Sequence, residues 1–249
     1  MTYNKANVFI EESNLERFGK NTARALCLNG SVASADIARE IISKLREIRD
    51  IHDRVQREVE KLSHLPEAYE WLLDNWYLAQ REGVSAATEL REAKRLRSVQ
   101  NGGAMIVELA SALVRSGLGD VAKERCEIFL TGFQQSRVLS RQELAIFVPS
   151  VKGALIDELC SLCKTLPRHG GDDSVGAAMG RVFGSLRLLS TLDLSTPWNA
   201  SIRPNKSCSE TPPISTGRWT SARATSTVGV CRNWQNSAAS KNTASPNVC

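Results

Sequence analysis

A long stretch of the sequence repeats apolar residues every seven positions, and this pattern restricts the possible folds most strongly. Between Ala33 and Leu62 the repeat consists of Ile41, Ile48, Val55 and Leu62, and four more aliphatic residues widen the stripe, namely Ile37, Leu45, Ile51 and Val59. Charged residues occupy the other faces. The pattern predicts one amphipathic α-helix, a rod of roughly 45 Å at 1.5 Å per residue, which packs along neighbouring helices.

Further helical patterns follow this helix as far as residue 194. The first has Pro66 in its first turn, runs to about Arg81 and continues after Gly83 as Ala86–Leu96. The next are Met105–Val114, Val121–Phe133, Arg141–Cys163 and Val175–Leu189. Ser140 and Glu143 form a capping-box pattern before the fourth of these, and Pro149 predicts a kink within it. Asn101–Gly103 and Pro167–Asp173 are predicted loops. No alternating strand pattern is evident, so the prediction is an all-α helical bundle over 33–194, preceded by a partly ordered segment, 1–32.

Residues 195–249 have a different composition. They include ten Ser, seven Thr, six Asn and five Pro, and they contain no Leu. A segment of this kind does not bury enough apolar surface to fold, so a disordered C-terminal tail is expected. The absence of Leu and the presence of three Trp are nevertheless unusual for an ordinary linker.

The charge distribution argues against nucleic-acid binding. The net charge is +5, but residues 195–249 hold six basic residues and one acidic residue, which leaves 26 of each sign for residues 1–194. The body is therefore neutral and has no basic stripe interleaved with aromatic residues. No apolar run approaches the ~20 residues of a membrane span, and the N-terminus lacks a signal-peptide pattern. The chain as written is expected to be cytoplasmic.

One short segment concentrates aromatic residues around two polar ones. It contains Trp71, Leu72, Leu73, Asp74, Asn75, Trp76 and Tyr77. A helix with this composition has almost no wholly polar face, which favours burial in a helical core. In that case Asp74 and Asn75 need partners, for which Arg24, Arg81 and a helix N-terminus are candidates. The alternative is a sugar-binding surface, with exposed rings beside polar acceptors.

No residue of the sequence forms a recognisable catalytic, metal or cofactor site. Cys160 and Cys163 have CxxC spacing, but they fall late in an apolar helix and not at a helix start, as redox motifs do. His52, His64 and His169 are scattered along the chain. No nucleotide-binding loop or hydrolase motif is present. The prediction is therefore a chain without catalytic residues, bound metal or cofactor.

The segment EWLLDNWYLAQREG, residues 70–83, resembles the N-terminal region of bacterial cyclic β-1,2-glucan synthases. Other similar stretches occur in the same order: 21–26 (NTARAL), 141–157 (from RQEL through ALID) and 188–193 (LLSTLD). The resemblance covers about residues 20–194. It implies a parent enzyme of the bacterial inner membrane that uses UDP-glucose to build β-1,2-glucan. The catalytic and membrane segments of that family lie C-terminal to the matched region. The resemblance thus implies a catalytically silent N-terminal fragment whose partners are helices of the parent synthase, with β-glucan as a possible ligand.

The tail departs from the family, whose members continue with a helix of the type DPA..Y..MDF. A one-nucleotide slip of the reading frame would explain the departure. Such a slip joins the last base of one codon to the first two bases of the next. Tryptophan has a single codon, so three outcomes are fixed: Trp198–Asn199 gives Glu, Trp219–Thr220 gives Asp and Trp234–Gln235 gives Ala. With synonymous choices elsewhere, residues 198–221 become LERVNPAEQVLLRDPADIYRQMDF, and the forced Asp falls within MDF. We therefore expect the sequence from about Ser195 to be an out-of-frame product. The rival interpretation is a free-standing helical scaffold or adaptor with a genuine tail.

Overall fold

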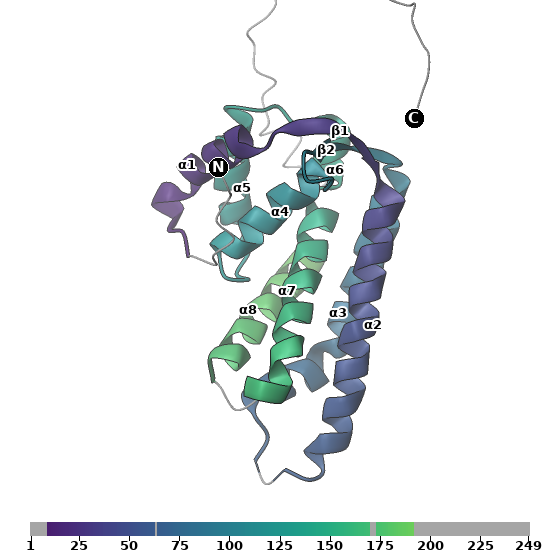
Figure 1. The fold of residues 1–249 in the computed structure, drawn as a ribbon. Helices are drawn as coiled ribbons and strands as arrows, with labels where there is room; N and C mark the ends of the chain where they lie inside the picture. The colour runs from purple at the N-terminus through teal and green to yellow at the C-terminus, as the bar shows by residue number, and fades with distance from the viewer. Residues whose placement is uncertain (1–8, 63, 170–172, 192–249) are drawn as a thin grey trace, which may run out of the picture. The chain divides into compact units, whose positions relative to one another are not determined.

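The predicted long amphipathic helix is present as α2 (Ser34–Val59), which has 26 residues and a length of about 39 Å. The computed structural model describes residues 9–62, 64–169 and 173–191 (Figure 1), and these belong to one compact unit. The apolar stripe of α2 is buried, including Ile41, Ile48 and Val55. The all-α prediction is confirmed for these residues. The predicted disordered tail, 195–249, lies outside them.

The second long helix, α3 (Glu67–Glu92), packs along α2 and passes through Gly83 without a break. Gly83 lies where the two helices approach closely, because a Cβ atom there would be 2.8 Å from Cδ1 of Leu45 on α2. The predicted interruption at Gly83 is therefore wrong, and the glycine serves helix–helix contact. Pro66 is the N-cap residue of α3, one position before its predicted place.

Helix α7 (Phe147–His169) lies at the centre of the bundle. It contacts α2, α3, α4 (Met105–Ser116) and α8 (Asp173–Thr191), and α8 also packs on α3. A second group is formed by α1 (Glu12–Ala25) and α5 (Lys123–Gln134), which pack on each other. The largest fully buried side chains include Phe129, Phe133, Phe147 and Phe183. One continuous apolar core thus joins helices from both halves of the described chain.

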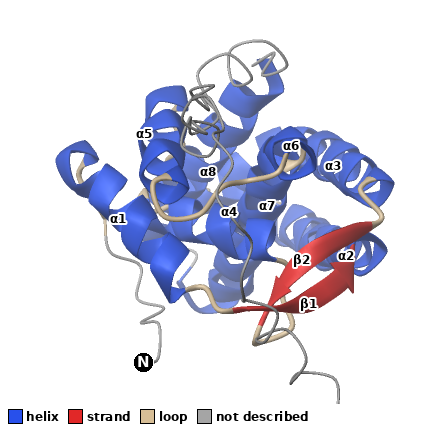
Figure 2. Cartoon of the chain, turned by 90° about the horizontal axis from the view of Figure 1, so that it is seen from above, coloured by secondary structure: helices blue, strands red, loops and turns tan. Residues whose placement is uncertain are grey.

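Two short strands are present that the sequence analysis did not predict. Strand β1 (Leu28–Ala33) pairs antiparallel with β2 (Arg95–Val99), with Ala33 opposite Arg95 and Leu28 opposite Val99 (Figure 2). The predicted helix through Leu96 is therefore wrong. After α3 ends at Glu92, Lys94 adopts a left-handed backbone conformation with φ of 58°. That turn redirects the chain into β2.

The predicted helix over 141–163 consists of two helices. The capping box is confirmed, since Glu143 N donates to Ser140 Oγ and Ser140 N donates to the Glu143 carboxylate, but it opens only the short α6 (Arg141–Ala145). A new helix, α7, starts at Phe147, so Pro149 lies in its first turn. A proline there removes no intrahelical hydrogen bond, so the expected mid-helix kink is replaced by a helix boundary. Residues 167–169, predicted as loop, belong to the end of α7.

Candidate functional site

The aromatic segment of the sequence lies on α3, where this helix meets α8 and α2. Leu72 is fully buried and Asn75 is 9% exposed, whereas Trp71, Leu73 and Trp76 are half-buried. Asp74 is exposed and Tyr77 is 71% exposed. The segment therefore has a buried side and a solvent side. The expectation of burial on most sides fails at Asp74 and Tyr77.

Trp71 connects α3 to α8. Its indole ring stacks on Phe183 with 6.4 Å between ring centroids, and its Nε1 donates to Glu67 Oε1 at 3.1 Å. Gly180 leaves room for the ring, because a Cβ atom at that position would lie 3.0 Å from two ring carbons of Trp71. These contacts make Trp71 a packing residue between two helices.

The polar partner of Asn75 is Arg187 on α8. Arg187 Nη2 donates to Asn75 Oδ1 at 3.0 Å, and Asn75 Nδ2 donates to the carbonyl oxygen of Trp71 at 3.0 Å. The side-chain partner of Asn75 is thus Arg187 and not the predicted Arg24 or Arg81, and Arg81 instead binds Glu82 at 2.8 Å. Sequence reasoning missed Arg187 because it is 112 residues away from Asn75.

Trp76 and Tyr77 point in different directions. The Trp76 ring lies against His52 of α2, with 5.8 Å between ring centroids. Tyr77 faces solvent, and the guanidinium carbon of Arg81 is 5.9 Å from its ring centroid. The two rings do not form one flat surface of the kind that stacks on successive sugars, but Tyr77 is open to a ligand.

A buried ion pair joins α3 and α7. Lys152 Nζ lies 2.8 Å from Glu82 Oε2, and both side chains are largely buried. Burial opposes ionisation of Glu82, but the hydrogen bonds from Lys152 and Arg81 outweigh it and lower the pKa of this carboxyl group. The sequence contains a signal for this pair, because Lys152 interrupts the apolar run of α7.

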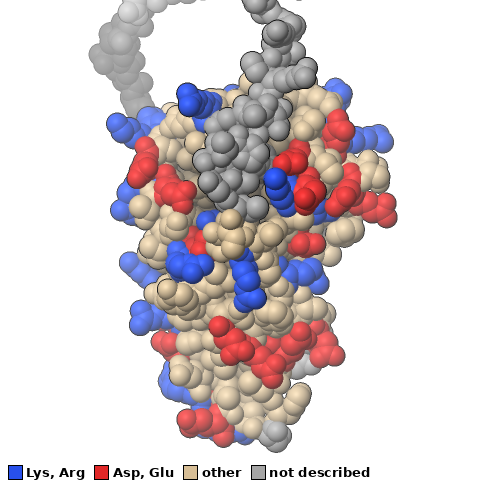
Figure 3. Space-filling model, turned by 180° about the vertical axis from the view of Figure 1, so that it is seen from behind, with Lys and Arg blue, Asp and Glu red and all other residues tan. Residues whose placement is uncertain are grey.

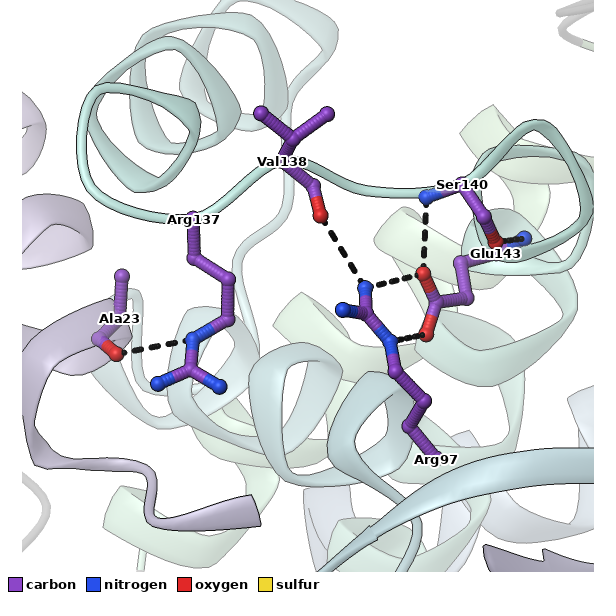
Figure 4. A network of polar contacts seen from close by, with 6 residues as sticks. All are labelled: Ala23, Arg97, Arg137, Val138, Ser140 and Glu143. Atoms are coloured by element: carbon purple, nitrogen blue, oxygen red, sulfur yellow. Dashed lines mark hydrogen bonds and ion pairs between the residues drawn. The ribbon is translucent and has the colours of Figure 1, made fainter. Parts of the chain in front are cut away.

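A second polar network holds β2 to the start of α6 (Figure 4). Arg97 binds Glu143 through two contacts, Nε to Oε1 at 2.7 Å and Nη2 to Oε2 at 2.5 Å, and Nη2 also donates to the carbonyl oxygen of Val138. Glu143 is 4% exposed, and its burial would raise the pKa, but Arg97 and the hydrogen bonds with Ser140 keep the pKa low. Every polar atom of the Glu143 carboxylate is thus engaged in holding elements together.

A groove of about 430 Å³ runs between α2, α4 and α7. On its wall Lys44 bridges two helices, with Nζ 2.8 Å from Glu40 and 2.7 Å from Asp157. Burial would lower the pKa of Lys44, but its two carboxylate partners raise it instead. The lysine charge is therefore already compensated within the protein.

The CxxC cysteines lie at buried positions of α7. Cys160 and Cys163 are both buried, and burial raises the pKa of each thiol, which disfavours the reactive thiolate. Among the described residues, no group of three or more His, Cys, Asp or Glu side chains is arranged to hold a metal ion. The polar clusters described above contact other parts of the protein.

The charge distribution of the described chain shows mixed signs on the face seen from behind. In Figure 3, basic and acidic side chains lie interspersed over this face, as expected for a body with equal numbers of each. Within the ranges that the structure covers, no helix combines the length and apolar character needed to cross a membrane. Comparisons of the chain with protein-family models, with curated proteins and with solved structures gave no match.

Proposed function

We propose that residues 33–194 are a non-catalytic helical domain of a bacterial cyclic β-1,2-glucan synthase, and that the sequence from about Ser195 is an out-of-frame product. The proposal originates in the resemblance of residues 70–83 and of three other stretches to that family. In the parent enzyme, UDP-glucose is the donor and β-1,2-glucan the product. The role of this domain is structural: it presents a rigid helical body to the rest of the synthase.

One structural observation supports this proposal most strongly. Stretches of the chain that carry the resemblance, although far apart in sequence, contact each other in the fold. Glu82 of the 70–83 stretch on α3 pairs with Lys152 of the 141–157 stretch on α7, with 2.8 Å between Oε2 and Nζ. Asn75 of the 70–83 stretch binds Arg187, the residue directly before the LLSTLD stretch. Trp71 of the same stretch stacks on Phe183. If the stretches resemble the family because they pack against one another, contacts between them are expected.

Transfer of glucose from labelled UDP-glucose tests the proposal. Bacterial membranes that contain the product of the gene with its frame restored after codon 194 should form β-1,2-glucan, and membranes with the present chain should not. Removing residues 33–191 from the restored enzyme should reduce its amount or activity, since the helical body would be missing. Glucan synthesis by the present chain, or none by the restored product, would contradict the proposal.

A second candidate function, binding of β-glucan, is favoured by one feature of α3. Tyr77 is 71% exposed and Asp74, one turn before it, is exposed as well, so a ring and a hydrogen-bond acceptor face solvent together. Titration of β-1,2-glucan against the intrinsic tryptophan fluorescence of the chain tests this function. A saturable change that Tyr77→Ala abolishes would support it, and no change up to millimolar glucan would exclude it.

A further inference from the structure

One exposed face of α3 carries a regular pattern that the packing of the bundle does not use. Seven exposed side chains follow one another at alternating spacings of four and three residues: Glu70, Asp74, Tyr77, Arg81, Val84, Thr88 and Arg91. This spacing keeps the side chains on a single stripe along an α-helix, and it is the heptad spacing by which two helices pack side by side. We call these seven residues the α3 stripe.

The chemistry of the α3 stripe changes from one end to the other. Its first two residues are acidic, its last residue is Arg91, and two large apolar side chains lie between them. These two, Tyr77 and Val84, are 71% and 46% exposed, which places them among the most exposed large apolar side chains of the described chain. Since the bundle covers the other sides of α3 with α2, α7 and α8, the stripe remains available to a further helix.

We infer that the α3 stripe pairs with the α3 stripe of a second copy of this chain, in antiparallel orientation. A two-fold axis between residues 80 and 81 places Glu70 opposite Arg91 of the second copy, and Tyr77 opposite Val84. Each contact then occurs twice, so the interface has two ion pairs at its ends and two apolar contacts nearer its centre. A parallel arrangement would place Glu70 against Glu70 and Arg91 against Arg91. Charge complementarity therefore selects the antiparallel pair.

Arg81 lies near the two-fold axis, where it would meet its own counterpart. This cost is reduced because Arg81 Nε already binds Glu82 Oε1 at 2.8 Å and its guanidinium group lies over the Tyr77 ring. The interface is small, with exposed ion pairs that contribute little each. We therefore expect a weak dimer with a dissociation constant on the order of 10–100 µM.

Sedimentation equilibrium of the full chain at about 10–300 µM tests this inference. The average mass should rise from 27.3 kDa towards twice that value as the concentration increases. Tyr77→Glu should abolish the rise, because it buries a charge in the centre of the interface. A chain that remains monomeric at 300 µM would overturn the inference.

A charge reversal identifies the orientation of the pair. Glu70→Arg places two arginines opposite each other at both ends and should weaken the dimer about tenfold, whereas the double variant Glu70→Arg/Arg91→Glu should restore it. Asp50→Arg, on the exposed side of α2, makes the same change of net charge as Glu70→Arg and should leave the dimer unchanged. Failure of the double variant to recover, or equal weakening by Asp50→Arg, would overturn the antiparallel α3 pairing.

Discussion

Arg187 on α8 donates a hydrogen bond to the side-chain oxygen of Asn75 on α3, with 3.0 Å between Nη2 and Oδ1. Asn75 is nearly buried, and its amide nitrogen is also engaged, with the carbonyl oxygen of Trp71. The aromatic segment of α3 is therefore fixed to α8 by a polar contact as well as by the stacking of Trp71 on Phe183. This relationship leads to the first two predictions.

Replacing Asn75 by alanine should destabilise the protein by about 1–3 kcal/mol, because it removes two hydrogen bonds made by a nearly buried side chain. Urea unfolding followed by circular dichroism measures the change. Asp74→Ala is the matched control: the neighbouring side chain is exposed, so its loss should change the unfolding free energy by no more than about 0.5 kcal/mol. Equal effects of the two substitutions would contradict the assignment of Asn75 to the α3–α8 contact.

Replacing Trp71 by alanine should destabilise the protein by about 3 kcal/mol, towards the lower end of the range for buried aromatic residues because Trp71 is only half-buried. If the domain is only marginally stable, the variant should unfold. Thermal unfolding distinguishes this from Tyr77→Ala, which removes a ring that is 71% exposed and should have little effect. A folded, equally stable Trp71→Ala variant that merely lost glucan binding would favour a sugar-binding surface over core packing.

Acid should remove the stabilisation that the Glu82–Lys152 pair provides. The pKa of Glu82 is lower in the folded protein than in the unfolded chain. The contribution is therefore present above the unfolded pKa and is lost as the pH falls through the folded pKa. A glutamate in an unfolded chain titrates near pH 4.3, so the loss should begin below about pH 4.5.

Urea unfolding between pH 3 and pH 7 measures this loss. The double variant Glu82→Leu/Lys152→Met removes both charges and keeps the apolar volume, so its stability should fall less steeply below pH 4.5. Its remaining acid sensitivity reports the other carboxylates with lowered pKa values, such as Glu143. Identical pH profiles for the double variant and the unmodified protein would show that the pair does not contribute to acid unfolding.

Two glycines in helices should respond in opposite directions to the same substitution. A Cβ atom on Gly132 of α5 would lie 1.9 Å from the carbonyl oxygen of Glu16 on α1, whereas one on Gly184 of α8 would meet nothing within 4 Å. Gly132→Ala should therefore destabilise by about 1–3 kcal/mol through the forced separation of α1 and α5. Gly184→Ala should stabilise by up to about 1 kcal/mol, because alanine has the higher helix propensity. Unfolding curves of both variants check the signs, and stabilisation by Gly132→Ala would show that α1 and α5 are not in close contact.

The sequence predicted the features that arise within single helices. The seven-residue repeat of α2, the capping box at Ser140 and the apolar character of α4 are local patterns, and each of these elements is present in the structure. The two strands were missed because β1 and β2 pair across more than 60 residues of chain, and each is too short to show a clear alternation of its own. Arg95, Leu96 and Arg97 do alternate between charged and apolar residues, but the helix predicted over Ala86–Leu96 includes part of this pattern.

The polar partners within the candidate site were also beyond local reasoning. The sequence could show that Asn75 required a partner, but the partner, Arg187, comes from a helix distant in sequence. Lys152, the partner of Glu82, also comes from a distant helix. The exposed position of Tyr77 depends on how α2, α7 and α8 surround α3. Buried and exposed side chains lie close together in the sequence of one helix. Only the packing of α3 against the other helices therefore shows which of its side chains are exposed.

The assignment to a glucan synthase depends most directly on the coding DNA around codons 190–200 and downstream of it. We expect that reading one base back restores a peptide with DPA and MDF, and that the same frame continues into a glycosyltransferase. An unambiguous DNA sequence that keeps the present frame, with no such peptide and no glycosyltransferase in any of the three frames, would contradict it.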